Sequence, residues 1–178
     1  MKKSLIIFLI PMCFAACSGG STSSSTTIGK DSVTATTVSL PFTAQYSSDF
    51  VPGKPADVAT VLNNYKAWQD NDMAALKSTF GDSVTMYFPS GSVFNGTNDS
   101  LMKDAKKFRD SIANVDLTIY AWTSNHSVDK NEDWVNVWYK EVDSYKTGKK
   151  DSANYEDDNR LKDGKIVWVS THQQKYKK

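Results

Sequence analysis

Three polar side chains recur at every second position near the end of the chain: Tyr155, Asp157 and Asn159. Alternate residues of a strand point to the same side, so a phenol, a carboxyl and an amide would share one wall. A carboxyl there can donate a hydrogen bond only if an apolar site raises its pKa enough to keep it neutral. Asp157 also lies in the acidic run Glu156-Asp157-Asp158, and such runs are usually solvated, so the sequence leaves both placements open.

The two histidines indicate chemistry more weakly. His126 falls within the polar stretch 124–133, which we expect to be an exposed strand connection. His172 is on the last expected strand, in phase with Trp168 and Ser170, so the three would share one face. Two isolated histidines are too few for a metal site, and the sequence has no glycine-rich phosphate loop and no nucleophile elbow. We therefore expect neither a metal nor a cofactor.

Cys17 follows Phe14-Ala15-Ala16 at the end of a short apolar run that begins after Lys2 and Lys3. The run is too short to span a bilayer, which takes about 20 apolar residues. The small residues before the cysteine resemble the lipobox of bacterial lipoproteins. The resemblance implies that residues 1–16 are a cleaved signal peptide and that Cys17 carries the acyl chains of a stable membrane anchor. An ordinary secretory signal with a chance cysteine is the alternative.

Cleavage before Cys17 would leave a chain with no free thiol, which excludes disulfides and thiolate metal sites. Loss of the two signal-peptide lysines would change the formal net charge from +1 to −1, so no nucleic-acid partner is expected. Residues 17–53 are rich in Ser and Thr and are expected to be a flexible tether. Ser18 resembles the residue that permits outer-membrane sorting in lipoproteins, so we expect an envelope protein that faces the periplasm. Three aromatic residues interrupt the tether and either pack as a stem or are scattered in coil: Phe42, Tyr46 and Phe50.

Residues 54–178 have the length of one domain. Apolar residues at helical spacing predict helices over residues 56–69, 73–80 and 99–112. Period-two patterns and β-branched residues predict strands at residues 84–88, around 93–94, and at 115–123, 134–143, 152–161 and 166–174. Helices that precede a largely antiparallel sheet give an α+β domain.

This order of elements resembles the nuclear-transport-factor-2-like superfamily, which includes SnoaL-like and ketosteroid-isomerase-like proteins. The segments that carry the resemblance are Val61–Phe80 running into Thr85-Met86-Tyr87-Phe88-Pro89, and Arg160–Ile166 near the end. The resemblance implies a curved, largely antiparallel sheet wrapped around three helices, a cone-shaped half-barrel with a pocket at its open end. This fold hosts isomerases, dehydratases and binding modules, so it does not assign an activity.

Ketosteroid-isomerase-like enzymes place a Tyr donor on the first helix and a protonated Asp three residues before the Arg of the penultimate strand. Tyr65 and Asp157 match these two donors, the latter by its distance from Arg160. The carboxylate base of those enzymes stands just before the Pro that ends the first strand, and here that residue is Phe88, before Pro89. Phe88 cannot accept a proton, and the sequence indicates no other obvious base.

The resemblance implies a mostly apolar pocket with a few polar groups. We expect seven residues to line it: Tyr65, Trp68, Met86, Phe88, Tyr155, Asp157 and Asn159. The expected function is binding of a small apolar ligand without catalysis. One alternative is an isomerase or dehydratase of a cyclic small molecule, with Tyr65 and Asp157 as donors and an unidentified base. Another is a protein-interaction module whose pocket is filled by its own side chains, with Tyr65 as part of the core.

Large aromatic residues are concentrated on the expected last strands: Trp122, Trp134, Trp138, Tyr139 and Trp168. A sheet of this shape buries one face on its helices, and large aromatics on the other face favour an interface. We therefore expect a homodimer through the outer face of the sheet. A core with scattered exposed tryptophans is the alternative.

Overall fold

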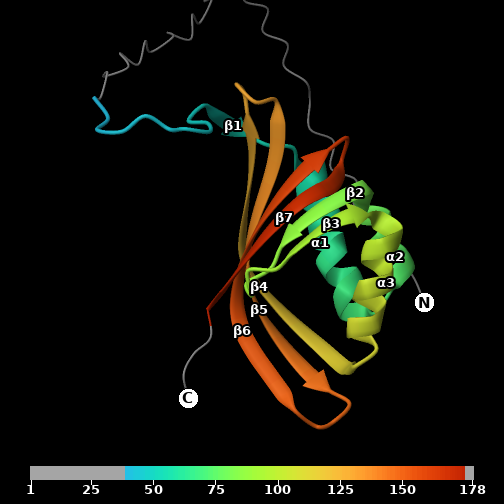
Figure 1. The fold of residues 1–178 in the computed structure, drawn as a ribbon. Coiled ribbons are helices and arrows are strands. Elements are labelled where there is room, and N and C mark those ends of the chain that lie inside the picture. Colours follow the sequence, from blue (N-terminus) through green and yellow to red (C-terminus); the bar gives the residue numbers. More distant parts are fainter. Residues whose placement is uncertain (1–38, 175–178) are drawn as a thin grey trace, which may run out of the picture. The chain divides into compact units, whose positions relative to one another are not determined.

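The computed structural model describes residues 39–174, and the chain from Phe42 onward forms one compact unit. Within this range there are three helices and one seven-stranded sheet (Figure 1). In chain order the elements are β1 (Phe50–Pro52), α1 (Pro55–Asp70), α2 (Met73–Thr79), β2 (Phe80–Tyr87), β3 (Val93–Thr97), α3 (Asn98–Arg109), β4 (Ile112–Ser127), β5 (Glu132–Tyr145), β6 (Lys150–Lys162) and β7 (Lys165–Gln174).

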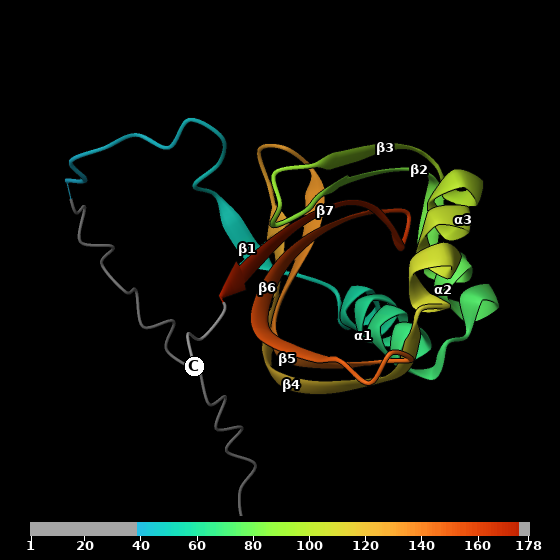
Figure 2. The ribbon, with the colours of Figure 1, turned by 60° about the horizontal axis from the view of Figure 1, so that its bottom comes forward.

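The strands lie in the order β1-β4-β5-β6-β7-β2-β3. All neighbouring pairs are antiparallel except β2 and β7, which are parallel. The long strands β4, β5 and β6 curve around α1, while α2 and α3 lie beside it (Figure 2). The sheet does not close, because β1 and β3 remain at its two edges. This arrangement confirms the α+β half-barrel that the sequence predicted.

Capping residues fix where the three helices begin and where α1 ends. Pro55 occupies the start of α1, where its missing N–H costs nothing, and Asn71 ends that helix in the left-handed conformation. Asp72 then caps α2 by accepting hydrogen bonds from the backbone N–H groups of Ala74 and Ala75. Thr97 caps α3 in the same way through the N–H of Ser100.

The core lies between α1 and the concave, inner face of the sheet. Along β5 the inward side chains are every second residue, and Val135, Val137 and Tyr139 are all buried. Val61 and Tyr65 of α1 pack against them. The period-two and helical patterns therefore bury the same apolar set that they marked in the sequence.

Arg109 ties three elements together at the end of α3. Its side chain is 4% exposed, and its guanidinium donates hydrogen bonds of 3.1 Å to the carbonyl oxygens of Trp68, Gln69 and Ile112. These carbonyls lie at the end of α1 and the start of β4. A buried guanidinium with a hydrogen bond from each of its three nitrogens holds the helices in place against the sheet.

The structure differs from the sequence prediction at the ends of several elements. Phe80 and Ile112, predicted as the last residues of helices, are the first residues of β2 and β4. Both are buried apolar residues whose spacing fits either element, so periodicity alone did not separate the two. The predicted connection 124–133 was also wrong, because β4 continues to Ser127 and β5 begins at Glu132. His126 therefore lies on a strand.

The sheet also takes in residues 50–52, which the sequence analysis assigned to the tether. β1 pairs with the end of β4, and the ring of Tyr46 lies edge-on to Trp134 at 6.3 Å. Gly53, the residue after β1, lies so close to β4 that a Cβ there would be 2.1 Å from Ser124 Oγ. Tyr46 and Phe50 thus belong to a stem that runs along the sheet, although both side chains are about half exposed, and Phe42 is 87% exposed. The predicted signal peptide, Cys17 and most of the tether lie outside the described residues.

No helix within residues 39–174 combines the length and apolar character needed to cross a membrane.

Candidate functional site

Asp157 is the centre of a buried hydrogen-bonded cluster on the inner face of the sheet. Its Oδ2 accepts hydrogen bonds from Tyr65 Oη of α1, at 2.7 Å, and from Tyr139 Oη of β5, at 3.1 Å. The three residues are 5%, 8% and 6% exposed, and the two tyrosine rings lie 4.9 Å apart. The structure therefore brings together the two matched residues, Tyr65 and Asp157, but hydrogen-bonds them to each other.

Burial and the Asp157 charge hold the pKa values of Tyr65 and Tyr139 well above their usual range, so both phenols stay protonated. Burial raises the pKa of Asp157 to about 6, although hydrogen bonds from Tyr65, Thr171 and Tyr139 act to lower it. At neutral pH Asp157 is therefore mostly ionised and accepts hydrogen bonds. The protonated donor that the resemblance implied at this position is not what these contacts favour.

The second carboxylate oxygen of Asp157, Oδ1, takes no part in these two hydrogen bonds. This oxygen is buried and has no hydrogen-bond partner of acceptable geometry, even though Thr171 lies opposite on β7 and is close enough to affect the pKa. A buried carboxylate oxygen without a partner is costly and usually marks a site for water or another donor.

The other expected lining residues are spread around this cluster. Tyr155 stacks on Tyr139 at 5.3 Å and accepts a hydrogen bond of 2.5 Å from Gln173 Nε2. Asn159 is 3% exposed and donates to the carbonyl oxygen of Val135 at 3.2 Å. Met86 is half-buried and packs against the core. These residues share the inner face, but Asn159 and Met86 serve the packed interior.

Phe88 follows β2 at the start of a turn, where its carbonyl oxygen accepts a hydrogen bond from the N–H of Gly91. Its side chain is 39% exposed, in contrast to Tyr65 and Asp157. A phenylalanine can supply only apolar contact there, so this position offers no base to a substrate.

The sequence analysis missed a carboxyl close to the cluster, Glu141. Glu141 continues the inward side of β5 two residues after Tyr139 and lies opposite Leu117 and Ala153. Its Oε1 accepts a hydrogen bond of 3.4 Å from Trp68 Nε1. The same period-two pattern that marked the strand could have found it, because inward positions of β5 run from valines to acids.

Asp143 extends the same row. It is 9% exposed, and its Oδ1 is buried without a partner. Burial, together with the neighbouring Asp143 charge, raises the pKa of Glu141 to about 8, and burial also raises the pKa of Asp143. At neutral pH Glu141 is mostly protonated, so it is a poor base despite its place beside the tyrosines.

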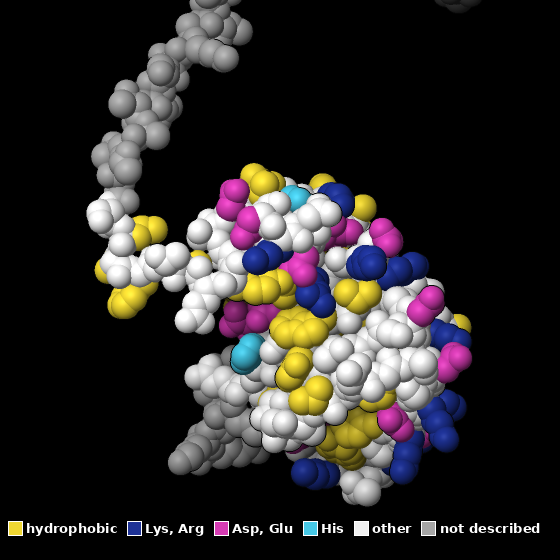
Figure 3. All heavy atoms as spheres, turned by 45° about the horizontal axis from the view of Figure 1, so that its top comes forward, with side chains coloured by type: hydrophobic (Ala, Val, Ile, Leu, Met, Phe, Trp, Pro, Cys, Tyr) yellow, Lys and Arg dark blue, Asp and Glu magenta, His cyan; other side chains and the backbone are white. Residues whose placement is uncertain are grey.

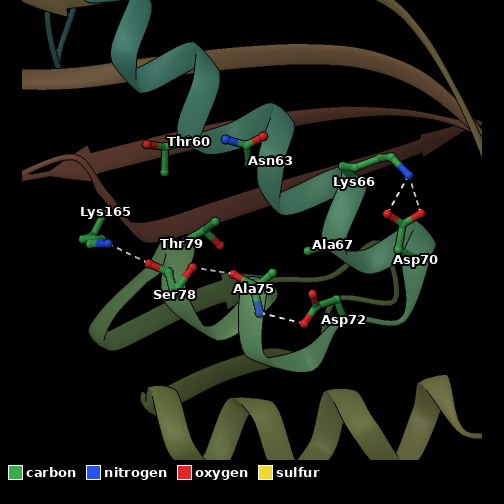
Figure 4. A pocket seen from close by; sticks show the side chains of 10 residues that line it. All are labelled: Thr60, Asn63, Lys66, Ala67, Asp70, Asp72, Ala75, Ser78, Thr79 and Lys165. Carbon is green, nitrogen blue, oxygen red and sulfur yellow. Dashed lines mark hydrogen bonds and ion pairs between the residues drawn. The ribbon is translucent and has the colours of Figure 1, made fainter.

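Two hollows of the described surface lie away from these residues. The first, about 410 Å³, is polar and lies between α1 and α2, where the Lys66–Asp70 ion pair and Lys165 stand on its walls (Figure 4). The second, about 460 Å³, is lined by Gly53, Pro55, Val58, Trp122, Thr123 and Ser124. None of the seven expected pocket residues lines either hollow. The deep part of the half-barrel is occupied by Tyr65, Tyr139 and their neighbours.

The histidines stand elsewhere. His126 Nδ1 lies 2.8 Å from Asp133 Oδ1, and Lys54 Nζ lies 2.7 Å from the other oxygen of that carboxylate. His172 lies on the opposite face of the sheet from Asp157, 3.7 Å from Asp158. Among the described residues, no three His, Cys, Asp or Glu side chains are grouped as metal ligands would be.

The sequence matches no protein-family model and no curated protein. Solved structures are similar in fold. An NTF2-like protein of unknown function from Exiguobacterium sp. 255-15 has a TM-score of 0.54 and 18% identity, over 66% of this chain and 99% of that one. An LEH-like epoxide hydrolase from M. tuberculosis has a TM-score of 0.57 and 12% identity, over 67% and 83% of the two chains. A protein with a ketosteroid-isomerase-like fold from Catenulispora acidiphila DSM 44928, solved in complex with trimethylamine, has a TM-score of 0.52 and 16% identity, over 64% and 83%.

The domain therefore has the nuclear-transport-factor-2-like fold, as the sequence resemblance predicted. At these identities the likeness shows the fold alone, and an activity has to be argued from the side chains of this chain.

The raised carboxyl pKa values predict how stability depends on pH. The folded protein holds protons on Glu141 and Asp157 more tightly than the unfolded chain, so their contribution is complete below about pH 4 and is lost as pH rises to about 8. We expect the free energy of unfolding to fall over this range, by up to about 1 kcal/mol per pH unit for each group. Chemical denaturation at a series of pH values measures it.

Glu141→Gln should flatten this pH dependence above about pH 6, where Asp157 has already titrated. Glu156→Gln, on the opposite face of the sheet, is the matched control and should leave the profile unchanged. A Glu141→Gln profile that still falls as steeply as that of the unchanged protein contradicts the assignment.

Proposed function

We propose that this protein is an envelope-anchored lipoprotein whose NTF2-like domain binds a small molecule without catalysis. The observation that carries the non-catalytic part is the closed cluster of Asp157. Both phenols that could stabilise an oxyanion donate to Asp157 instead, and all three residues are buried. A substrate would find neither a free donor there nor a base at Phe88.

The isomerase or dehydratase alternative gains one group, Glu141, that the sequence analysis had not named. Its raised pKa keeps it protonated at neutral pH, so it could act as an acid but not as the missing base. The geometry therefore favours binding over chemistry.

We place the ligand on the inner face of the sheet, beside the buried Asp157 cluster. There the side chains of Trp68, Glu141 and Tyr155 are half-buried, and Leu117 and Ile119 add apolar surface beside them. We call these five residues the rim. They combine apolar walls with a few polar groups, which is the usual composition of a ligand site. The structural neighbour solved with trimethylamine supports a small ligand of this kind for the fold.

The anchor and location follow from the segment before the domain. Cys17 after Ala15-Ala16 supports lipidation, and the Ser/Thr-rich residues that follow support a tether to the outer membrane, with the domain in the periplasm. The ordered stem with Tyr46 continues that tether onto the sheet.

We also propose that the outer face of the sheet forms a homodimer. Four rings cross it in sequence from Tyr46 to Trp134, Trp168 and Tyr87, at centroid separations of 6.3, 5.5 and 5.6 Å. Tyr87 is 44% exposed. The face drawn in Figure 3 carries hydrophobic side chains near its centre, with Lys, Arg, Asp and Glu side chains around them. An apolar centre with a charged rim is typical of an interface.

Replacement of Cys17 by Ser should abolish labelling with a radioactive or alkyne fatty acid, because the thioether cannot form. The protein should then move from the membrane to the soluble fraction of cells that express it. Labelling that persists in Cys17→Ser would contradict the anchor, and a serine substitution at Cys13 is the control.

A molecule that co-purifies with the full chain should be visible by native mass spectrometry. Trp68→Leu should reduce its occupancy at least several-fold, because the indole contributes to the rim. Tyr65→Phe should leave occupancy unchanged, because Tyr65 is committed to Asp157. Loss of the molecule in Tyr65→Phe with normal circular dichroism would favour the enzyme-like pocket instead.

Tyr87→Glu should shift the protein from dimer to monomer in light scattering after size exclusion, because it places a charge on the apolar outer face. Tyr120→Glu is the control, since Tyr120 is 57% exposed and lies on the far strand β4. A protein that is monomeric without substitution, or a dimer that withstands Tyr87→Glu, overturns this interface.

A further inference from the structure

The acidic row of β5, with its neighbour on β6, brings three carboxyls together on the inner face of the sheet. Glu141 and Asp143 point to the inner face two residues apart, and Asp157 on β6 acts electrostatically on Glu141. Within residues 39–174 no lysine, arginine or histidine forms an ion pair with any of the three. Buried carboxyls normally have a cation or several hydrogen-bond donors beside them.

The Arg109 guanidinium acts to lower the pKa of Asp143 through its charge. Its N–H groups are directed to the backbone carbonyls of Trp68, Gln69 and Ile112 and do not pair with the carboxylate. Asp151, opposite Asp143 on β6, adds further negative charge, which raises the pKa of Asp143. Arg109 therefore acts on Asp143 without an ion pair, and a side-chain hydrogen bond with Glu141 also acts to lower the pKa of Asp143.

One buried oxygen of the row, Asp143 Oδ1, has no hydrogen-bond partner. Asp143 is 9% exposed, so bulk water does not satisfy this oxygen. An unpartnered buried oxygen is rare in a folded protein and points to a ligand.

Aromatic rings surround the same row. Trp68 approaches Glu141 through its Nε1 at 3.4 Å, while its ring stacks on Phe108 at 6.2 Å and faces the Arg109 guanidinium at 5.9 Å. Tyr155 stacks on Tyr139 beside the Asp157 cluster, with an interplanar angle of 19°. Aromatic faces attract organic cations through their quadrupole, and carboxylates add direct charge attraction.

We propose that Glu141 and Asp143 bind a small organic cation, an alkylated amine, against the ring of Tyr155 and beside the Nε1 edge of Trp68. This inference rests on the proposed function, because it assigns the ligand class of the rim. It replaces the neutral apolar ligand that the sequence suggested. A metal ion fits less well, since the acids of this row do not form a metal-ligand group.

The proposal implies exchange of a proton for the cation. Without a ligand, the row reduces its repulsion by holding protons on Glu141 and Asp143. A bound cation favours the ionised carboxylates, so binding releases protons and strengthens as pH rises toward 8. The tyrosines that face the row stay protonated throughout this range, because their pKa values are raised.

The test compares two probes of the same shape, choline and its neutral isostere 3,3-dimethylbutan-1-ol, by isothermal titration with the purified full chain. We expect choline to bind roughly tenfold or more tightly than the neutral alcohol. Titration in two buffers of different ionisation enthalpy should also show proton release.

Glu141→Gln should weaken choline binding roughly tenfold and remove most of the proton release, whereas Glu156→Gln should change neither. Asp143→Asn, checked by circular dichroism, is a second variant in case the first one unfolds, and it should act in the same direction.

Equal binding of the two probes, or a preference for the alcohol, overturns the cation proposal and leaves the binding function intact. Failure of both probes to bind also overturns it. The co-purified molecule seen by native mass spectrometry then decides the proposed function separately: a neutral molecule supports that function, and none contradicts it.

Discussion

The hydrogen bonds from Tyr65 and Tyr139 to Asp157 are the interaction on which this structure depends most. They join α1 to two central strands inside a nearly dry interior. A carboxylate at this depth is tolerated because two protonated phenols face it, and burial, together with the carboxylate charge, raises the pKa values of those phenols. The orientation of α1 in the half-barrel, and hence the shape of the inner face, follows from this mutual requirement.

The same cluster separates this chain from the enzymes whose positions it shares. A Tyr and an Asp at matching positions can donate to a substrate only when neither is the other's partner. Here the two are bonded directly, a second phenol, Tyr139, completes the cluster, and Phe88 stands at the base position. A chain can therefore keep the Tyr and the Asp of these enzymes without keeping their active site, because rotation of a side chain changes a free hydrogen-bond donor into a structural contact.

The inner face changes in character along its length. Toward one end β5 contributes Val135 and Val137, which are fully buried, and toward the other it contributes Glu141 and Asp143. The apolar end stabilises the fold, and the acidic end holds carboxyls that have no ion pair with a cation among the described residues. Arg109 could have paired with them, but its guanidinium is required by three backbone carbonyls where the helices meet the sheet.

Local patterns in the sequence were enough to predict the three helices, the long strands and their common inner face, because side-chain period and capping residues such as Asp72 act over a few residues. They misplaced Phe80, Ile112 and His126, where an apolar or polar residue fits two elements equally well. They also grouped Asp157 with Tyr155 and Asn159 correctly on one wall. Only the tertiary structure decided that Tyr65 reaches Asp157, that Tyr139 joins them and that Glu141 stands beside them. Hydrogen bonds and desolvation depend on distances between residues up to 92 positions apart, and no local pattern contains those distances.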